Sequence, residues 1–179
     1  YQRVGEKPNT LVGNALEFVP GRCAALDLGA GNLRDAKFLL GQGFGRVVAV
    51  DEDPESQGFV VPGIELHLAA IENYAPMPGT FDLVVSLNTM FFLSVSGMEK
   101  VLNAAREGLR SSGVLACNFL GEEDDWIVSG GPLVECVTED ILAAFQSGWK
   151  LLLPPGETRR VDEGSGKHWH TWSLVLQKY

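Results

Sequence analysis

Short apolar runs alternate with longer amphipathic stretches along the chain. Five of the runs are apolar at almost every position, and several are rich in β-branched residues: residues 23–28, 46–50, 64–69, 81–87 and 114–119. Runs of this kind are typical of parallel strands that are covered on both faces. Between and after them, three stretches have the spacing of apolar residues expected of helices: residues 33–42, 96–109 and 138–147. The pattern therefore predicts strands and helices in alternation around a largely parallel sheet.

The C-terminal part of the pattern differs from the rest. Two further apolar runs, residues 149–153 and 172–176, are joined by a polar connection that contains three glycines. This connection suits a long hairpin, so we expect the sheet to end in an antiparallel pair, with the last strand beside the fifth. The predicted fold class is α/β, a three-layer Rossmann-like arrangement with a seven-stranded mixed sheet, an antiparallel last strand and helices on both faces. With 179 residues, we expect one domain over residues 1–179.

The charge of the chain limits its partners. Lys and Arg total 14 against 23 for Asp and Glu, which gives a formal net charge of -9 at pH 7. This charge would repel the phosphates that supply most of the affinity for nucleic acids, so we expect no nucleic-acid partner. No apolar run reaches the roughly 18 residues that span a bilayer, and the start, Tyr1–Lys7, lacks the apolar core of a secretory signal. We therefore expect a cytoplasmic protein without a membrane partner, while the sequence does not indicate an oligomeric state.

A glycine-rich turn, Gly29-Ala30-Gly31, follows the first predicted strand. A turn of this kind at the carboxyl end of a strand is where open α/β sheets bind ligands, because the backbone can approach a ligand closely where no Cβ intervenes. The second predicted strand ends at Asp51, 20 residues after Gly31, where a carboxylate can accept hydrogen bonds from both hydroxyls of a ribose. The two features together predict a nucleoside-binding site.

Two observations bear on which nucleoside cofactor binds there. A dinucleotide site favours a small residue three positions after the second glycine, beneath the pyrophosphate, and this chain has Arg34 at that position. From Val47 through Glu99 there are eight acidic residues and no Lys or Arg, which disfavours a pyrophosphate and tolerates a cation. S-adenosylmethionine carries a sulfonium and no phosphate. A nicotinamide-dependent oxidoreductase is therefore disfavoured, whereas a non-catalytic S-adenosylmethionine- or nucleoside-binding module remains an alternative to an enzyme.

These residues resemble the class I S-adenosylmethionine-dependent methyltransferases. The Asp27-x-Gly29-x-Gly31 turn is similar to the first motif of that family, Asp51 to its ribose-binding acid and residues 81–88 to its fourth strand. The resemblance covers about residues 20–179 and is strongest to small single-domain members of the type-11 and tellurite-resistance-like groups. It implies an enzyme that transfers a methyl group from S-adenosylmethionine to a small-molecule acceptor. The chain departs from many members at Leu33, where they carry a third glycine.

The resemblance also implies a cofactor site. Asp27 would lie behind the loop, Asp51 would bind the ribose, Glu52 would flank the adenine, and Asn88 would face the transferable methyl group. Gly29 and Gly31 would admit the methionine tail. The residues assigned to the cofactor in this way are Asp27, Gly29, Gly31, Asp51, Glu52, Ala70, Ile71 and Asn88.

The acceptor site is expected at the same edge of the sheet. Phe91 could wall the methyl channel, although paired Phe residues more often serve only in packing, and Trp126 and Trp169 come from the loop after the fifth strand and the segment before the last. His168 is the expected proton acceptor, with Asn88 beside the reacting atoms. His168 and His170 lie on one face of the last strand with no further ligand at a suitable spacing, so we expect no metal site. Arg159 and Arg160 could meet an anionic acceptor, but a solvated hairpin is the simpler interpretation.

Overall fold

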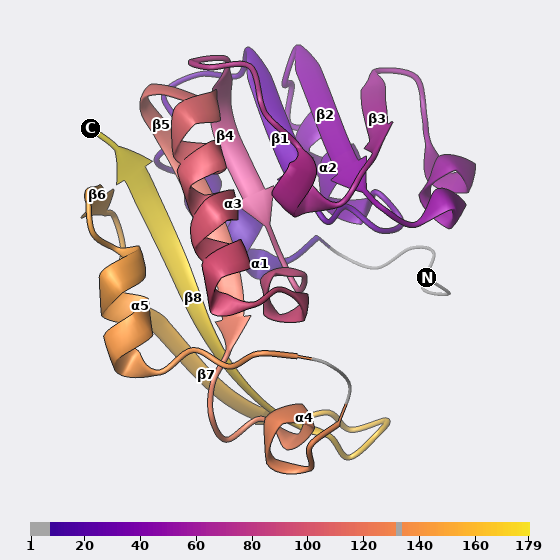
Figure 1. The fold of residues 1–179 in the computed structure, drawn as a ribbon. Helices are drawn as coiled ribbons and strands as arrows, with labels where there is room; N and C mark the ends of the chain where they lie inside the picture. The colour runs from indigo at the N-terminus through magenta and orange to yellow at the C-terminus, as the bar shows by residue number, and fades with distance from the viewer. Residues whose placement is uncertain (1–7, 132–133) are drawn as a thin grey trace.

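Strands and helices alternate through most of the chain, as the pattern predicts. The structure is a computed structural model, and it describes residues 8–131 and 134–179 (Figure 1); the start read above for a secretory signal, Tyr1–Lys7, lies outside this part. The described elements follow in this order: α1 (Thr10–Leu16), β1 (Ala24–Leu28), α2 (Arg34–Gly41), β2 (Arg46–Asp51), η1 (Pro54–Phe59), β3 (Ile64–Leu68), η2 (Ile71–Asn73), β4 (Phe81–Ser86), η3 (Met90–Phe92), α3 (Val95–Gly108), β5 (Leu109–Leu120), α4 (Asp125–Val128), α5 (Glu139–Phe145), β6 (Trp149–Leu151), β7 (Gly156–Val161) and β8 (His168–Lys178).

One mixed sheet connects all the strands. Its order is β3-β2-β1-β4-β5-β8-β6, with β7 also paired to β8. The first five strands along this path are parallel to their neighbours, and β8 is antiparallel to β5. The predicted mixed sheet, with its last strand inserted antiparallel beside the fifth, is therefore confirmed, and the fold is the three-layer Rossmann-like one.

The predicted connection between the last two apolar runs contains an additional strand. β6 and β7 follow one another along the same edge of β8, with Leu151 opposite Leu176 and Gly156 opposite Ser173. Pro154 lies between them, where a residue without an N–H group interrupts strand pairing. All residues of β7 are exposed, so the strand has none of the apolar alternation by which a sequence reveals a half-buried strand. The sheet consequently has eight strands rather than the predicted seven.

Helices cover both faces of the sheet (Figure 1). On one face, Met98 and Leu102 of α3 pack with Leu142 of α5 against the sheet, and on the other, Val12 of α1 and Leu39 of α2 do so. Because both faces are covered, β1 and β4 are buried at every position, which is why they read as continuous apolar runs. None of the helices in the described part is long and apolar enough to cross a membrane.

The turn after β1 ends at Leu33. Many members of the family that the sequence resembles have glycine at this position. Leu33 has a left-handed backbone, with φ 60° and ψ 26°, and it precedes the first residue of α2. Its side chain is fully buried in the cluster formed by α1, α2 and the sheet. Leucine thus adopts the conformation that glycine would adopt at lower cost, and the burial of its side chain offsets the strain.

Variants at Leu33 test this balance. A left-handed leucine costs roughly 1–2 kcal/mol, whereas removing a buried leucine side chain costs about 2.7–5 kcal/mol. We expect Leu33→Gly to lower the free energy of unfolding by roughly 1–3 kcal/mol, because it relieves the strain and loses the side chain. Leu33→Ala loses nearly as much burial and keeps the strain, so it should be the less stable of the two. Urea unfolding gives the order, and a glycine variant less stable than the alanine variant would contradict this account.

Candidate functional site

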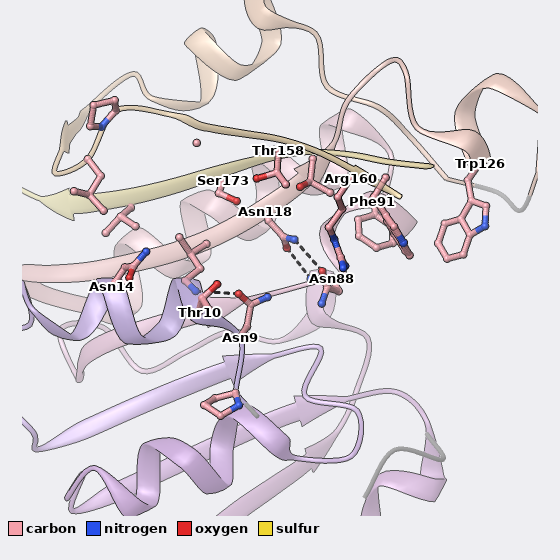
Figure 2. A pocket seen from close by; sticks show the side chains of 18 of the residues that line it. Asn9, Thr10, Asn14, Asn88, Phe91, Asn118, Trp126, Thr158, Arg160 and Ser173 are labelled. Atoms are coloured by element: carbon pink, nitrogen blue, oxygen red, sulfur yellow. Dashed lines mark hydrogen bonds between the residues drawn. The ribbon is translucent and has the colours of Figure 1, made fainter. Parts of the chain in front are cut away.

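Two cavities adjoin at the carboxyl ends of the parallel strands. The first, which we call the glycine-loop cavity, has a volume of about 570 Å³ and is lined by Gly29, Gly31, Asp51, Glu52, Asp53, Ala70, Ile71, Glu72, Asn88, Thr89, Phe92 and Leu93. The second, the hairpin cavity, has a volume of about 860 Å³ and is lined by Pro8, Asn9, Thr10, Leu11, Asn14, Asn88, Phe91, Phe92, Asn118, Trp126, Leu153, Pro154, Gly156, Thr158, Arg160, Trp169, Thr171, Ser173 and Val175 (Figure 2). Asn88 and Phe92 line both. A molecule bound in one cavity can therefore approach a molecule bound in the other.

The glycine loop is shaped by a close approach between two loops. Gly29 has a φ of +78°, and a Cβ at this position would overlap the side chain of Thr89, which follows β4. Gly29 is therefore required by packing as well as by any ligand. The amides of Gly29 and Ala30 both donate to the carbonyl oxygen of Val50, at 2.8 and 3.1 Å. The loop after β1 is thus held against the end of β2.

Asp51, at the end of β2, also fixes this loop through hydrogen bonds. This buried carboxylate accepts the backbone N–H of Gly31 on Oδ2, at 2.7 Å, and the N–H of Asp53 on Oδ1, at 2.9 Å. Each carboxylate oxygen has a second lone pair, so both can also accept a hydroxyl group from a ligand in the cavity. The geometry fits a residue that both positions the loop and binds a diol.

Asp27 lies near the end of β1 and is almost completely buried. Its Oδ2 has no hydrogen-bond partner in the described part of the chain. Burial, and then the nearby negative charge of Asp35, raise the pKa of Asp27 to about 8. An unpartnered carboxyl oxygen behind this loop fits the amino group of a methionine tail, whose positive charge would stabilise the carboxylate.

The charge of the glycine-loop cavity favours a cationic ligand. Four of its lining residues are acidic: Asp51, Glu52, Asp53 and Glu72. The described lining of this cavity contains no Lys or Arg. Half of the eight acidic residues noted in the sequence therefore line this cavity. Such a lining fits the sulfonium and ammonium groups of S-adenosylmethionine and does not fit a pyrophosphate.

Aromatic side chains form a continuous wall of the hairpin cavity. We call Phe91, Phe92, Trp126 and Trp169 the aromatic wall. The ring centroids are 4.8 Å apart for Phe91 and Phe92, 6.1 Å for Phe91 and Trp126, and 5.2 Å for Trp126 and Trp169. The wall extends from Phe92, which borders the glycine-loop cavity, to Trp169 on β8. It offers apolar surface against which a small organic molecule can be buried.

The structure brings nearly all of the predicted site residues to these cavities. Of the residues assigned to the cofactor, those that line the glycine-loop cavity are Gly29, Gly31, Asp51, Glu52, Ala70, Ile71 and Asn88, while Asp27 lies buried behind the loop. Of those assigned to the acceptor, Phe91, Trp126 and Trp169 line the hairpin cavity.

His168 lies elsewhere. Successive residues of a strand point to opposite faces, and Trp169, Thr171 and Ser173 line the hairpin cavity whereas His168 and His170 do not. The Nδ1 atom of His168 is 3.0 Å from the carbonyl oxygen of Glu123, so the ring is engaged with the loop before α4. This placement gives no support to the expectation that His168 accepts a proton from an acceptor molecule, and we assign it no such role.

Several lining residues had not been singled out from the sequence. Asn118 was detectable in principle, because it is a polar residue within the apolar run of β5. Thr158, Thr171 and Ser173 come from the β7–β8 pair, of which β7 had not been predicted. The residues of α1 carried no signal of a site. Within residues 8–131 and 134–179, no three His, Cys, Asp or Glu side chains are grouped so that they could hold a metal ion.

Comparison with known proteins points to one family. The model of a family described as "Methyltransferase domain" matches residues 26–117. No curated protein matches the chain. Among solved structures, the N-methyltransferase NodS from Bradyrhizobium japonicum, in complex with S-adenosyl-L-homocysteine, is 13% identical with a TM-score of 0.74, covering 99% of this chain and 91% of that one. A SAM-dependent methyltransferase from Methanosarcina mazei is 12% identical with a TM-score of 0.73, covering 97% and 99% of the two chains. At these identities the structures establish similarity of fold.

The raised pKa of Asp27 makes stability depend on pH. Because the folded-state pKa of Asp27, about 8, lies above the ordinary value of 3.8 for an aspartate, the folded protein binds the proton more tightly than the unfolded chain does. This carboxyl should therefore reduce the free energy of unfolding progressively as pH rises from about 4 to about 8. Asp27→Asn removes that contribution, so the variant should be more stable than the wild type at pH 9 and similar at pH 4. Thermal unfolding across this pH range, without ligand, checks it; parallel pH profiles for both proteins would contradict the assignment.

Proposed function

Because the chain belongs to the methyltransferase domain family, we propose that it transfers a methyl group from S-adenosylmethionine to a small-molecule acceptor. The observation that carries the proposal is the pair of adjoining cavities, which share Asn88 and Phe92. A binding module needs only the glycine-loop cavity. The presence of a second cavity, which shares two lining residues with the first at the position of the expected methyl group, favours an enzyme.

S-adenosylmethionine is the cofactor. We assign different residues of the chain to different parts of it. We assign Asp51 to the ribose hydroxyls, Glu52 to the neighbourhood of the adenine, and Ala70 and Ile71 to the edge of the ring. Gly29 and Gly31 leave room for the methionine part of the cofactor, in front of Asp27. These assignments rest on the lining of the glycine-loop cavity and on the hydrogen bonds that already fix its loop.

The bound cofactor would supply an electrophilic methyl group on a sulfonium. Attack by a lone pair of the acceptor on the methyl carbon would form the new bond and break the carbon–sulfur bond, with its electron pair left on sulfur, and a proton on the acceptor atom, where there is one, would leave to water. Among the described residues, no Asp, Glu or His lines the hairpin cavity, so the role we propose for this lining is alignment rather than that of a base. Asn88 and Phe92 would hold the reacting atoms together, and alignment of this kind can provide a large part of the acceleration.

The size of the hairpin cavity supports a small acceptor. Its volume of about 860 Å³ lies within the roughly 300–1,000 Å³ typical of small-molecule sites. Geranyl diphosphate C-methyltransferase from Streptomyces coelicolor, 7% identical with a TM-score of 0.73 over 95% of this chain, was solved with the small molecule geranyl diphosphate. A fold of this kind can therefore accommodate such a substrate.

Asp51 provides the sharpest test of the cofactor site. Asp51→Ala should weaken the binding of S-adenosylhomocysteine by about a hundredfold or more, because two charge-assisted hydrogen bonds to the ribose are lost, each worth about 1.5–3 kcal/mol. Asp53 lines the same cavity, so Asp53→Ala is a control for the loss of one negative charge and should change affinity by no more than about threefold. Titration calorimetry measures both, with thermal unfolding to confirm folding. Equal affinities for wild type and Asp51→Ala, or tighter binding of NAD than of S-adenosylhomocysteine, would overturn the assignment.

A further inference from the structure

The hairpin cavity differs in charge from the rest of the molecule. The chain has a formal net charge of -9, and the adjoining glycine-loop cavity is lined by four acidic residues. The described residues that line the hairpin cavity nevertheless include no Asp or Glu, and Arg160 is the one charged residue among them. From this described lining, a bound molecule would experience one positive charge and no negative charge.

Arg160 differs from its neighbour Arg159 in its partners. Arg159, on the opposite side of β7, donates to Glu123 at 2.8 and 3.2 Å and pairs with Glu157 at 2.7 Å. No carboxylate pairs with the guanidinium of Arg160 in the described ranges, and its Cζ instead lies 6.0 Å from the ring centroid of Trp169. Figure 2 shows the Arg160 side chain extending into the cavity that Asn88 also lines.

The charged groups close to Arg160 are occupied by other partners. Lys167 lies 3.5 Å from the ring centroid of Trp169, does not line the hairpin cavity, and pairs with the buried Asp124 at 2.5 Å. Asp125 accepts the backbone N–H of His168, and Asp162 accepts three hydrogen bonds within the β7–β8 turn. Among the described charged groups near Arg160, its guanidinium is therefore the cation that lines the hairpin cavity without a carboxylate partner.

We propose that the acceptor is a small planar carboxylate, an inference that rests on the proposed methyl transfer. Its carboxylate would bind Arg160, whose planar guanidinium suits two parallel hydrogen bonds to such a group. Its planar body would lie against Trp169 and Trp126 of the aromatic wall, and its nucleophilic atom would reach the position where Asn88 and Phe92 border the cofactor. A phosphate monoester, with about two negative charges, matches the single cation less well than a carboxylate does.

Arg160 is then the residue that selects the acceptor. It belongs to an exposed strand, so water screens part of its charge, and we expect the lower end of the effect of a charged hydrogen bond, about tenfold in affinity. Because Arg160 would hold the carboxylate of the acceptor and not its reacting atom, its loss should raise KM for the acceptor and leave kcat nearly unchanged.

The test uses matched sets of probes. Aromatic and heteroaromatic acids that carry a hydroxyl, amino or thiol group, among them the hydroxy- and aminobenzoates and indole carboxylates, are compared with their primary amides and with the corresponding benzylic amines. Formation of S-adenosylhomocysteine by the wild-type protein should be found with members of the acid set, at least about tenfold above their amides in kcat/KM. Preferred turnover of amides or amines, or no turnover of any acid while S-adenosylhomocysteine binds normally, would overturn the carboxylate proposal and leave the cofactor site intact. Failure of S-adenosylhomocysteine to bind would instead remove the proposed function.

Two variants complete the test. Arg160→Gln should raise KM for the best acid about tenfold and narrow the difference between acid and amide, with unchanged affinity for S-adenosylhomocysteine. Arg159→Gln removes the same charge from the adjacent position outside the cavity and should change KM by less than about twofold. Equal effects of the two variants would show a general loss of positive charge rather than a binding site.

Discussion

The arrangement of the two cavities depends on a reciprocal pair of hydrogen bonds between two asparagines. The backbone N–H of Asn88 donates to Oδ1 of Asn118 at 2.7 Å, and Nδ2 of Asn118 donates to Oδ1 of Asn88 at 2.9 Å (Figure 2). Asn88 has a φ of 57°, a conformation that asparagine tolerates better than most residues. The pair therefore fixes a sharp change of direction after β4. That turn places Thr89 against Gly29 and directs Phe91 and Phe92 between the cavities.

Charge separates the two cavities as clearly as shape does. The glycine-loop cavity collects carboxylates from the ends of β2 and β3, so a cationic cofactor is stabilised there. The hairpin cavity adjoins it on the side of β5 and β8, where no acidic residue of the described chain lines it, and its charge comes from Arg160. If the acceptor is the proposed carboxylate, its negative charge and the positive charge of the cofactor would attract each other across Asn88, and the charge distribution would favour the encounter that the proposed methyl transfer requires.

The sequence predicted the parallel half of the fold better than the antiparallel half, for a physical reason. Buried parallel strands are apolar at most positions, and this signal identified β1 and β4 almost to the residue. β7 is an exposed strand that is held in place by backbone hydrogen bonds to β8. Backbone pairing alone requires no particular pattern of apolar side chains, so the sequence does not reveal this strand. The cofactor residues lie on loops after parallel strands, so a motif could locate them. The residues of the hairpin cavity depend on a strand that no pattern indicated.

The position of His168 shows why the acceptor side is harder to predict. Alternation along β8 places His168 and His170 on one face, but which face is decided by pairing with β5. Both faces of β8 are apolar: Leu174 packs in the core beneath α3 and α5, and Val175 packs in the opposite one. The hydrophobic pattern therefore cannot distinguish them, and a shift of one residue would exchange every side chain. The register that forms places Trp169 beside Arg160 instead, so the chemistry of the acceptor site can change along the hairpin while the cofactor site, built on other strands, stays the same.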